Sequence, residues 1–264
     1  MPHIRLNSTE FYYELSGKGH PLVFVTGYAA DHFFWSPILA ELEKHFQVLV
    51  FDHRGVGQTR DQESHPLTAQ IMAEDVLGLI KALGLKKPHI VGQSMGGTIV
   101  QHLAAHHPDT ISKLAILNST LKWRKAMLLG LQSMLNVMRD GCPFDTFFDL
   151  NLSWVYGEAF LQNQTKVAFL KNLFLNNSNP PTLPSLERQY HTLTAFDGRP
   201  TLAKIKAPTL VVSGLEDIIS LPYESREIAE GIPGSKLVEL FCGHGITAEM
   251  PEELAQVLKE FLLE

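Results

Sequence analysis

The chain has 264 residues, enough for one large domain or two smaller ones, and its 45% hydrophobic residues can form a sizeable core. Charged residues make up only 19%, the net charge is −6, and the sequence pI is near 6.0. Intrinsic disorder goes with low hydrophobicity and high charge, and nucleic-acid binding goes with a basic patch or a high pI. The composition therefore excludes both classes.

The ends and the cysteines give expectations about the compartment. The N-terminal residues contain no apolar stretch of the kind found in a signal peptide, and no window of about 18 uncharged apolar residues occurs. Two cysteines, Cys142 and Cys242, do not make a disulfide framework in a chain of this length. We expect a cytoplasmic protein with no membrane span, and two cysteines that serve as packing residues.

Short runs rich in Val, Ile and Phe alternate along the chain with segments of helical spacing, which predicts a largely parallel sheet. The first two runs, His3 to Leu6 and Glu10 to Leu15, precede any helix and predict an antiparallel edge hairpin. The later strands are expected at Pro21 to Thr26, Gln47 to Phe51, His89 to Gly92, Leu114 to Asn118, Thr209 to Ser213 and Lys236 to Phe241. The helices between and after them are expected at Trp35 to His45, Thr68 to Leu83, Met95 to His107, Pro222 to Glu230 and Pro251 to Leu263. The pattern predicts a doubly wound α/β fold with eight strands.

The strand rhythm stops between residues 119 and 195, where only helical patterns and an Asn- and Pro-rich loop occur. This segment carries seven Lys and Arg residues against five Asp and Glu residues, and it is rich in Met and aromatic side chains. We expect a core made of residues 1–118 and 196–264, with residues 119–195 as an inserted helical cap, or lid.

The sequence Gly92-Gln93-Ser94-Met95-Gly96 matches the pattern GxSxG where an apolar strand turns into a helix. A serine on such a strained turn projects from the end of the sheet, and Gly92 and Gly96 leave room for the neighbouring strand and helix. The turn also places Ser94 at a helix N-terminus, which favours developing negative charge. Ser94 is the predicted nucleophile of this elbow.

A serine hydroxyl needs a general base and a carboxylate that orients the base, and after such an elbow they follow in the order acid, then His. Asp217 follows the strand at Thr209 to Ser213, and His244, flanked by glycines, follows the last strand. Glu216 is the competitor for the acid, but we favour Asp217 because its spacing carries the side chain past the strand end. The alternative position after Leu117 holds Asn118 and no carboxylate. Asp217 and His244 are the predicted partners of Ser94.

The oxyanion of the transition state needs backbone donors. The N–H of Met95, directly after the nucleophile, is one candidate, and the N–H of Tyr28 in the Thr26-Gly27-Tyr28 loop is the other. The HGGG form of this loop is absent.

An apolar substrate pocket is expected beneath the cap, since such clefts set specificity. Its candidate lining residues are Gly27, Trp123, Met127, Phe144, Phe147 and Trp154. Lys122, Arg124 and Lys125 open the cap; they could receive a substrate carboxylate, although solvated helix charges are the favoured interpretation. His102 and His106 are spaced like metal ligands but lack an accompanying Glu or third ligand, so we expect no metal and no cofactor. Asp52 and Arg54, in the loop after the strand at Gln47 to Phe51, are expected to pair with each other.

The chain resembles the α/β-hydrolase superfamily, in particular the branch of 3-oxoadipate enol-lactonases and small carboxylesterases. The resemblance covers almost the whole chain and rests on the elbow, on the run from Asp52 to Gly57, on Ala207-Pro208-Thr209 leading to Asp217, and on Gly243-His244 followed by Glu249 and Pro251. It implies Ser94, Asp217 and His244 as a triad beneath a cap. One departure is Thr26, where many relatives have His.

These observations favour a cofactor-independent serine hydrolase that cleaves a small apolar carboxylic ester or lactone through an acyl-enzyme. Two other enzymatic hypotheses use the same triad. One is a hydrolase of C–C bonds in ring-cleavage products, and the other is a cofactor-free perhydrolase. A small-molecule receptor on the same fold is the non-enzymatic alternative. Ser rather than Asp at position 94 disfavours dehalogenase and epoxide hydrolase chemistry.

Overall fold

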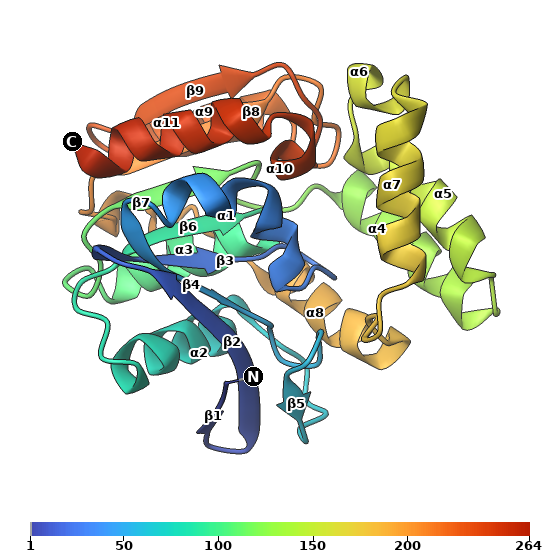
Figure 1. Ribbon diagram of the computed structural model, residues 1–264, viewed down its shortest axis with the longest axis horizontal. Coiled ribbons are helices and arrows are strands. Elements are labelled where there is room, and N and C mark those ends of the chain that lie inside the picture. Colours follow the sequence, from blue (N-terminus) through green and yellow to red (C-terminus); the bar gives the residue numbers. More distant parts are fainter. Residues whose placement is uncertain (1) are drawn as a thin grey trace.

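A central sheet organises the chain in the computed structural model, which describes residues 2–264 (Figure 1). β1 (His3–Leu6) and β2 (Thr9–Gly17) form the expected antiparallel hairpin, and β2 pairs antiparallel with β4 (Phe46–Phe51). The remaining strands of the path pair in parallel: β3 (His20–Val25), β4, β6 (His89–Gln93), β7 (Leu114–Leu117), β8 (Thr209–Gly214) and β9 (Lys236–Leu240). The order is β1-β2-β4-β3-β6-β7-β8-β9. The eight expected strands and the mostly parallel sheet are confirmed.

One short strand was not predicted from the sequence. β5 (Arg60–Asp61) is two residues long and pairs antiparallel with β2. A run this short carries no alternation of apolar and polar residues, so no periodicity signals it.

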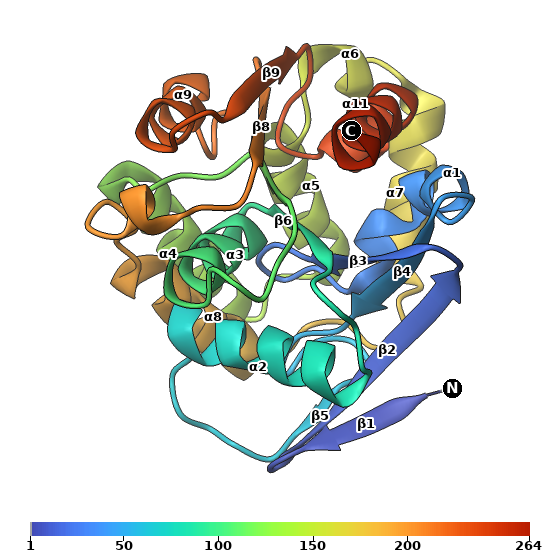
Figure 2. The ribbon, with the colours of Figure 1, turned by 90° about the vertical axis from the view of Figure 1, so that its left-hand side faces the viewer.

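Helices cover both faces of the sheet, as expected for strands that are apolar on both sides. Along β3 the side chains alternate, so that Val23 and Val25 join one core cluster and Leu22 and Phe24 join the other. The first cluster packs under α2 (Ala69–Ala82), α3 (Met95–His106) and α9 (Pro222–Gly231). The second packs under η1 (His32–Trp35), α1 (Ser36–Leu42), α10 (Ile246–Glu249) and α11 (Pro251–Leu263). Figure 2 shows α2, α3 and α9 on one side of the strands and α1 and α11 on the other.

Residues 119–195, called the helical insertion below, connect β7 to β8. They form α4 (Lys125–Arg139), α5 (Phe144–Val155), α6 (Glu158–Leu161), α7 (Gln164–Leu175) and α8 (Leu183–Ala195), followed by η2 (Leu202–Lys204) in the return to the sheet. In Figure 1, α4 to α7 stand to one side of the sheet. α8 is tied to the β5 region, because Arg188 pairs with Asp61 at 2.9 Å and donates to the carbonyl of His65. Within residues 2–264, no helix is long and apolar enough to cross a membrane.

The expected pairing of Asp52 with Arg54 is wrong. Arg54 instead forms a two-pronged ion pair with Asp75 of α2, at 2.6 Å from Nε and 2.7 Å from Nη2. The Asp52 carboxylate is turned toward His32, accepting from its backbone N–H and lying 2.7 Å from its Nδ1. Arg54 therefore fastens the loop to α2, and Asp52 fastens it to η1.

Candidate active site

Ser94 lies on a strained turn between β6 and α3. Its φ of 56° and ψ of −119° place a non-glycine residue in a backbone conformation that side chains rarely adopt. Neighbouring glycines allow this turn: a Cβ on Gly92 would lie 2.5 Å from the carbonyl oxygen of Gly96, and a Cβ on Gly96 would overlap the carbonyl of Val25. The Ser94 N–H donates to the carbonyl of Leu117 at 2.9 Å, which holds the turn against β7. The backbone thus presents the hydroxyl at the carboxyl edge of the sheet.

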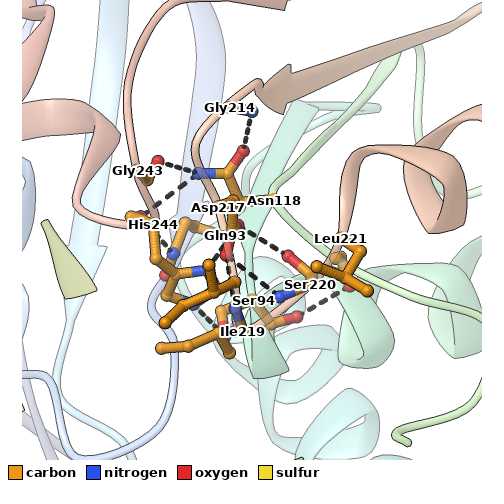
Figure 3. Close-up of polar contacts among 12 residues, drawn as sticks. Gln93, Ser94, Asn118, Gly214, Asp217, Ile219, Ser220, Leu221, Gly243 and His244 are labelled. Carbon is orange, nitrogen blue, oxygen red and sulfur yellow. Dashed lines mark hydrogen bonds and ion pairs between the residues drawn. The ribbon is translucent and has the colours of Figure 1, made fainter. Parts of the chain in front are cut away.

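The structure brings Ser94, His244 and Asp217 together from three separate loops. His244 Nε2 lies 2.8 Å from Ser94 Oγ, and its Nδ1 lies 2.7 Å from Asp217 Oδ2 (Figure 3). All three side chains are buried, with 5%, 7% and 1% of the residue exposed for Ser94, His244 and Asp217. A hydroxyl, an imidazole and a carboxylate in this chain of hydrogen bonds have the geometry for passing a proton from oxygen to nitrogen.

Asp217, and not its neighbour Glu216, is the carboxylate next to the imidazole. Its Oδ1 accepts from the N–H groups of Ile219 and Ser220, and its Oδ2 accepts from the Ser220 hydroxyl at 2.8 Å. Glu216 points elsewhere and accepts from the N–H of Glu158 in the helical insertion. The carboxylate that faces His244 is therefore fixed by three donors besides the imidazole.

Asn118 also supports the site, a role that was not predicted from the sequence. The sequence pattern indicated only that this position holds no carboxylate. It follows β7 with a φ of 42°, and its side chain is buried. Nδ2 donates to the carbonyls of Gly243 and His244, and Oδ1 accepts from the N–H of Gly214 at 2.7 Å (Figure 3). Asn118 thereby joins the loop that carries the histidine to the strand that leads to Asp217. The sequence held a signal for this role, because Asn118 is a polar residue at the carboxyl end of a parallel strand, which is the edge where sites form in open α/β sheets.

The loop that follows β3 lies directly against the nucleophile. A Cβ on Gly27 would lie 2.5 Å from Gln93 Oε1 and 3.0 Å from the Ser94 Cβ, so the backbone of this loop comes close to the nucleophile. Met95 is the first residue of α3, where a backbone N–H has no partner within the helix. These contacts place the loop of Tyr28 and the N–H of Met95 on the Ser94 side of the sheet.

The helical insertion and one buried histidine hold that loop. The Tyr28 hydroxyl donates to the carbonyl of Leu186, and the Ala29 N–H donates to Gln189 Oε1 at 2.9 Å. Beneath the loop, His53 Nε2 lies 3.0 Å from the Thr26 carbonyl, and burial lowers the pKa of His53 to about 4. The neutral ring therefore donates its N–H to Thr26.

The other predicted pocket residues fall into two groups. Trp123 and Met127 are buried in the same core cluster as Met95, and Tyr28 packs against that cluster. Phe144 stacks on Phe147 and on Phe174 of α7, and Trp154 lies against Gly130 of α4. The first group belongs to the core cluster that also holds Met95, and the second packs among the helices of the insertion. Their role as a pocket lining stays a prediction.

Two cationic side chains at the start of the insertion form ion pairs with acidic residues of the chain. Lys122 pairs with Asp197 at 3.4 Å, and Arg124 pairs with Glu224 at 3.2 Å while donating to the carbonyls of Ile218 and Ile219.

Cys242 is buried, and burial raises the pKa of its thiol, as expected for a packing residue.

The fold and this arrangement define a hydrolase of the α/β type. A family model described as the alpha/beta hydrolase fold matches residues 20–249, and the chain belongs to that family.

Among curated proteins, the chain is similar to one from Azorhizobium caulinodans named "Putative carbamate hydrolase RutD", with 27% identity over 99% of this chain and 98% of the relative. Among solved structures, it is similar to the enol-lactonase from Burkholderia xenovorans LB400, with a TM-score of 0.89, 27% identity and full coverage of both chains. It is also similar to a thermophilic esterase from Thermogutta terrifontis, with a TM-score of 0.86, 25% identity, and coverage of 100% of this chain and 98% of that one. These relatives establish that the chain is an enzyme of the hydrolase class, and the resemblance to the enol-lactonase and esterase branch is confirmed. A carbamate was not among the substrates expected from the sequence.

Proposed function

We propose that the protein hydrolyses a small carboxylic ester or lactone, with Ser94 as nucleophile, His244 as general base and Asp217 as the residue that orients the base. The observation that carries the proposal is the unbroken chain of short contacts from Ser94 Oγ through the imidazole to Asp217, buried at the carboxyl edge of the sheet. His244 Nε2 takes the serine proton as Oγ attacks the carbonyl carbon, and it returns that proton to the leaving alkoxide. A water then attacks the acyl-enzyme with His244 again acting as the base.

The oxyanion is assigned to two backbone donors, the N–H groups of Met95 and Tyr28. The first opens α3, where the helix dipole adds to the attraction for negative charge. The second lies in the loop that Gly27 brings against Ser94. Donors of this kind matter because the loss of a single one has cost about a hundredfold to a thousandfold in kcat in other enzymes.

The helical insertion is proposed to be the cap over the site, with core segments 1–118 and 196–264 below it. Support comes from contacts of the insertion with two of the loops that surround Ser94: Leu186 and Gln189 of α8 bond the Tyr28 loop, and Val155 bonds the loop of His244. We assign an uncharged acyl group to the substrate, because Lys122 and Arg124 are held by acidic partners of the chain itself and Lys125 is exposed at the start of α4. Its pocket is assigned to Gly27, Trp123, Met127, Phe144, Phe147 and Trp154.

A carbamate is the second candidate substrate, favoured by the name of the curated relative that spans nearly all of this chain. The same nucleophile would attack the carbamate carbonyl and form a carbamoyl-enzyme, which water then hydrolyses. The two candidates differ in the group transferred to Ser94 and not in the residues that transfer it.

The test compares the wild type, Ser94→Ala and a control, Ser153→Ala, an exposed position in α5. Each is assayed on p-nitrophenyl butyrate, an enol-lactone and an aryl carbamate. We expect turnover with the wild type and the control, and a loss of at least about a thousandfold with Ser94→Ala. The substrate with the highest kcat/KM decides between ester, lactone and carbamate. Equal activity of Ser94→Ala and the wild type on all three substrates would refute the mechanism.

A further inference from the structure

The loop that carries His244 is bound along its backbone by a segment of the helical insertion. Val155, at the end of α5, offers its carbonyl to two donors, the N–H of His244 at 2.8 Å and the N–H of Gly245 at 2.9 Å. On the other side of the contact, Glu249 Oε2 accepts from the N–H of Gly243 at 2.9 Å and from the N–H of Gly157 at 3.0 Å. We call this contact, formed by residues 155–157, residues 243–245 and Glu249, the glycine seam.

Three glycines make the close approach possible. A Cβ on Gly243 would lie 2.6 Å from the backbone nitrogen of Gly157, and a Cβ on Gly157 would lie 3.0 Å from the nitrogen of Gly243. A Cβ on Gly245 would overlap the ring of Tyr156. The glycines on either side of His244 are therefore required by the packing of the insertion against the loop, in addition to any freedom they give the histidine.

Within the glycine seam, the Glu249 side chain accepts hydrogen bonds from both the helical insertion and the loop of His244. Its Oε2 is used twice, whereas its Oε1 is buried and has no hydrogen-bond partner among residues 2–264. Burial raises the pKa of the Glu249 carboxyl, against the lowering effect of the N–H groups of Gly243, Gly157 and Gly245. A raised carboxyl pKa means that the contribution of this group to the stability of the folded state falls as the pH rises.

We propose that Glu249 is a positioning residue, which clamps the helical insertion to the loop of His244 and thereby fixes the imidazole between Ser94 and Asp217. The proposal rests on the catalytic role proposed above for His244. The clamp holds the insertion and the base in one arrangement, so that the imidazole stays at 2.8 Å from Ser94 Oγ. Displacement of a reacting group by about 1 Å has cost other enzymes about a hundredfold in rate, so a modest loosening has a measurable effect.

The test uses two substitutions with different chemistry. Glu249→Leu removes both acceptor oxygens, whereas Glu249→Gln keeps one oxygen that can accept from Gly243 and Gly157. Glu227→Leu, an exposed position in α9, is the matched control. The first measurement is amide hydrogen exchange at Gly243, His244 and Gly245, which reads the seam without any reaction. We expect exchange to be at least about tenfold faster in Glu249→Leu, and close to the wild type in Glu249→Gln and Glu227→Leu.

The second measurement is ester turnover by the same proteins. We expect kcat of Glu249→Leu to fall about tenfold or more with KM within about twofold, and Glu249→Gln to keep at least about a third of the wild-type kcat. Gly243→Ala, whose Cβ would lie 2.6 Å from the backbone nitrogen of Gly157 and so push the segment away while keeping Glu249, is the second route to the same loss if Glu249→Leu does not fold.

The outcomes separate the two proposals. Unchanged exchange at the three amides, or wild-type kcat in a folded Glu249→Leu protein, overturns the clamp. A wild type that neither turns over an ester nor reacts at Ser94 refutes the proposed function instead, and the exchange result then still decides whether Glu249 holds the loop.

Discussion

Gln189 of α8 accepts a hydrogen bond from the backbone N–H of Ala29 at 2.9 Å, across a sequence separation of 160 residues. Gln189 is buried, and Ala29 has a φ of 63°, a conformation that costs energy for any residue other than glycine. The bond therefore holds a strained loop in place, and that loop contains the proposed oxyanion donor, the N–H of Tyr28.

Gln189→Leu removes this acceptor and leaves the partly buried N–H of Ala29 without it. We expect kcat for ester hydrolysis to fall about tenfold, because an oxyanion donor that is displaced but not removed loses part of its effect. Steady-state kinetics beside Thr194→Leu, an exposed position on the same helix, provide the check. Equal kcat values for the two variants would show that α8 does not position the loop.

Asn118→Ala tests the junction between the histidine loop and the strand of the acid. Its side chain satisfies the carbonyls of Gly243 and His244 and the N–H of Gly214, all of which lose a partner. We expect the free energy of unfolding to fall by about 3 kcal/mol, since each buried unsatisfied group costs about 1 to 3 kcal/mol and such costs do not add fully. Urea unfolding measures it, with Asn172→Ala on α7 as an exposed control. A loss under about 0.5 kcal/mol contradicts the assigned role.

Arg54 and Asp75 form a buried ion pair, so removing one partner strands the other charge. Arg54→Met is expected to lower the free energy of unfolding by about 3 kcal/mol or more. The double variant Arg54→Met with Asp75→Leu is expected to recover part of that loss, because no unpaired carboxylate remains at position 75. The unfolding free energies of the wild type, of Arg54→Met, of Asp75→Leu and of the double variant are compared by denaturant titration. A double variant that is less stable than the single one by the full effect of Asp75→Leu alone would mean that the two residues are not coupled.

His53 makes the fold sensitive to acid. Burial lowers the pKa of its imidazole to about 4, below the value of about 6.5 for an unfolded chain. As the pH falls, the unfolded state takes up the proton first, so stability is full above about pH 6.5 and declines toward pH 4. Between pH 7 and pH 5 this residue alone accounts for about 2 kcal/mol of lost stability.

His53→Gln is expected to flatten that decline, and His65→Gln, at an exposed position, is expected to leave it unchanged. Urea unfolding at both pH values measures the difference. A decline in His53→Gln as steep as in the wild type would assign the acid sensitivity to other groups.

Most of the fold could be predicted from the sequence, because apolar runs and helical spacing are local properties. The turn around Ser94 and the placement of Asp217 and His244 after strand ends also follow from short segments. Contacts between segments that are distant in the sequence could not be predicted from such local patterns. Arg54 was expected to pair with Asp52, but Asp75 lies on the facing side of α2, and only the packing of that helix brings it near.

The supporting residues of the site show the same limit. Asn118, Gln189 and Glu249 act through backbone groups of other loops, so their partners have no side-chain signature. The glycines around His244 were visible, but the segment that packs against them lies about 90 residues away and has an unrelated pattern.

The role of Ser94 as the nucleophile is tested most directly by the site of reaction with a fluorophosphonate, which phosphonylates an activated serine. The protein is treated with the probe, digested, and mapped by mass spectrometry beside Ser94→Ala. We predict one adduct on the peptide that contains Ser94, loss of that adduct in Ser94→Ala, and strongly slowed labelling in His244→Ala. An unlabelled wild-type protein, or an adduct at another residue that persists in Ser94→Ala, would contradict the assignment of Ser94 as the nucleophile.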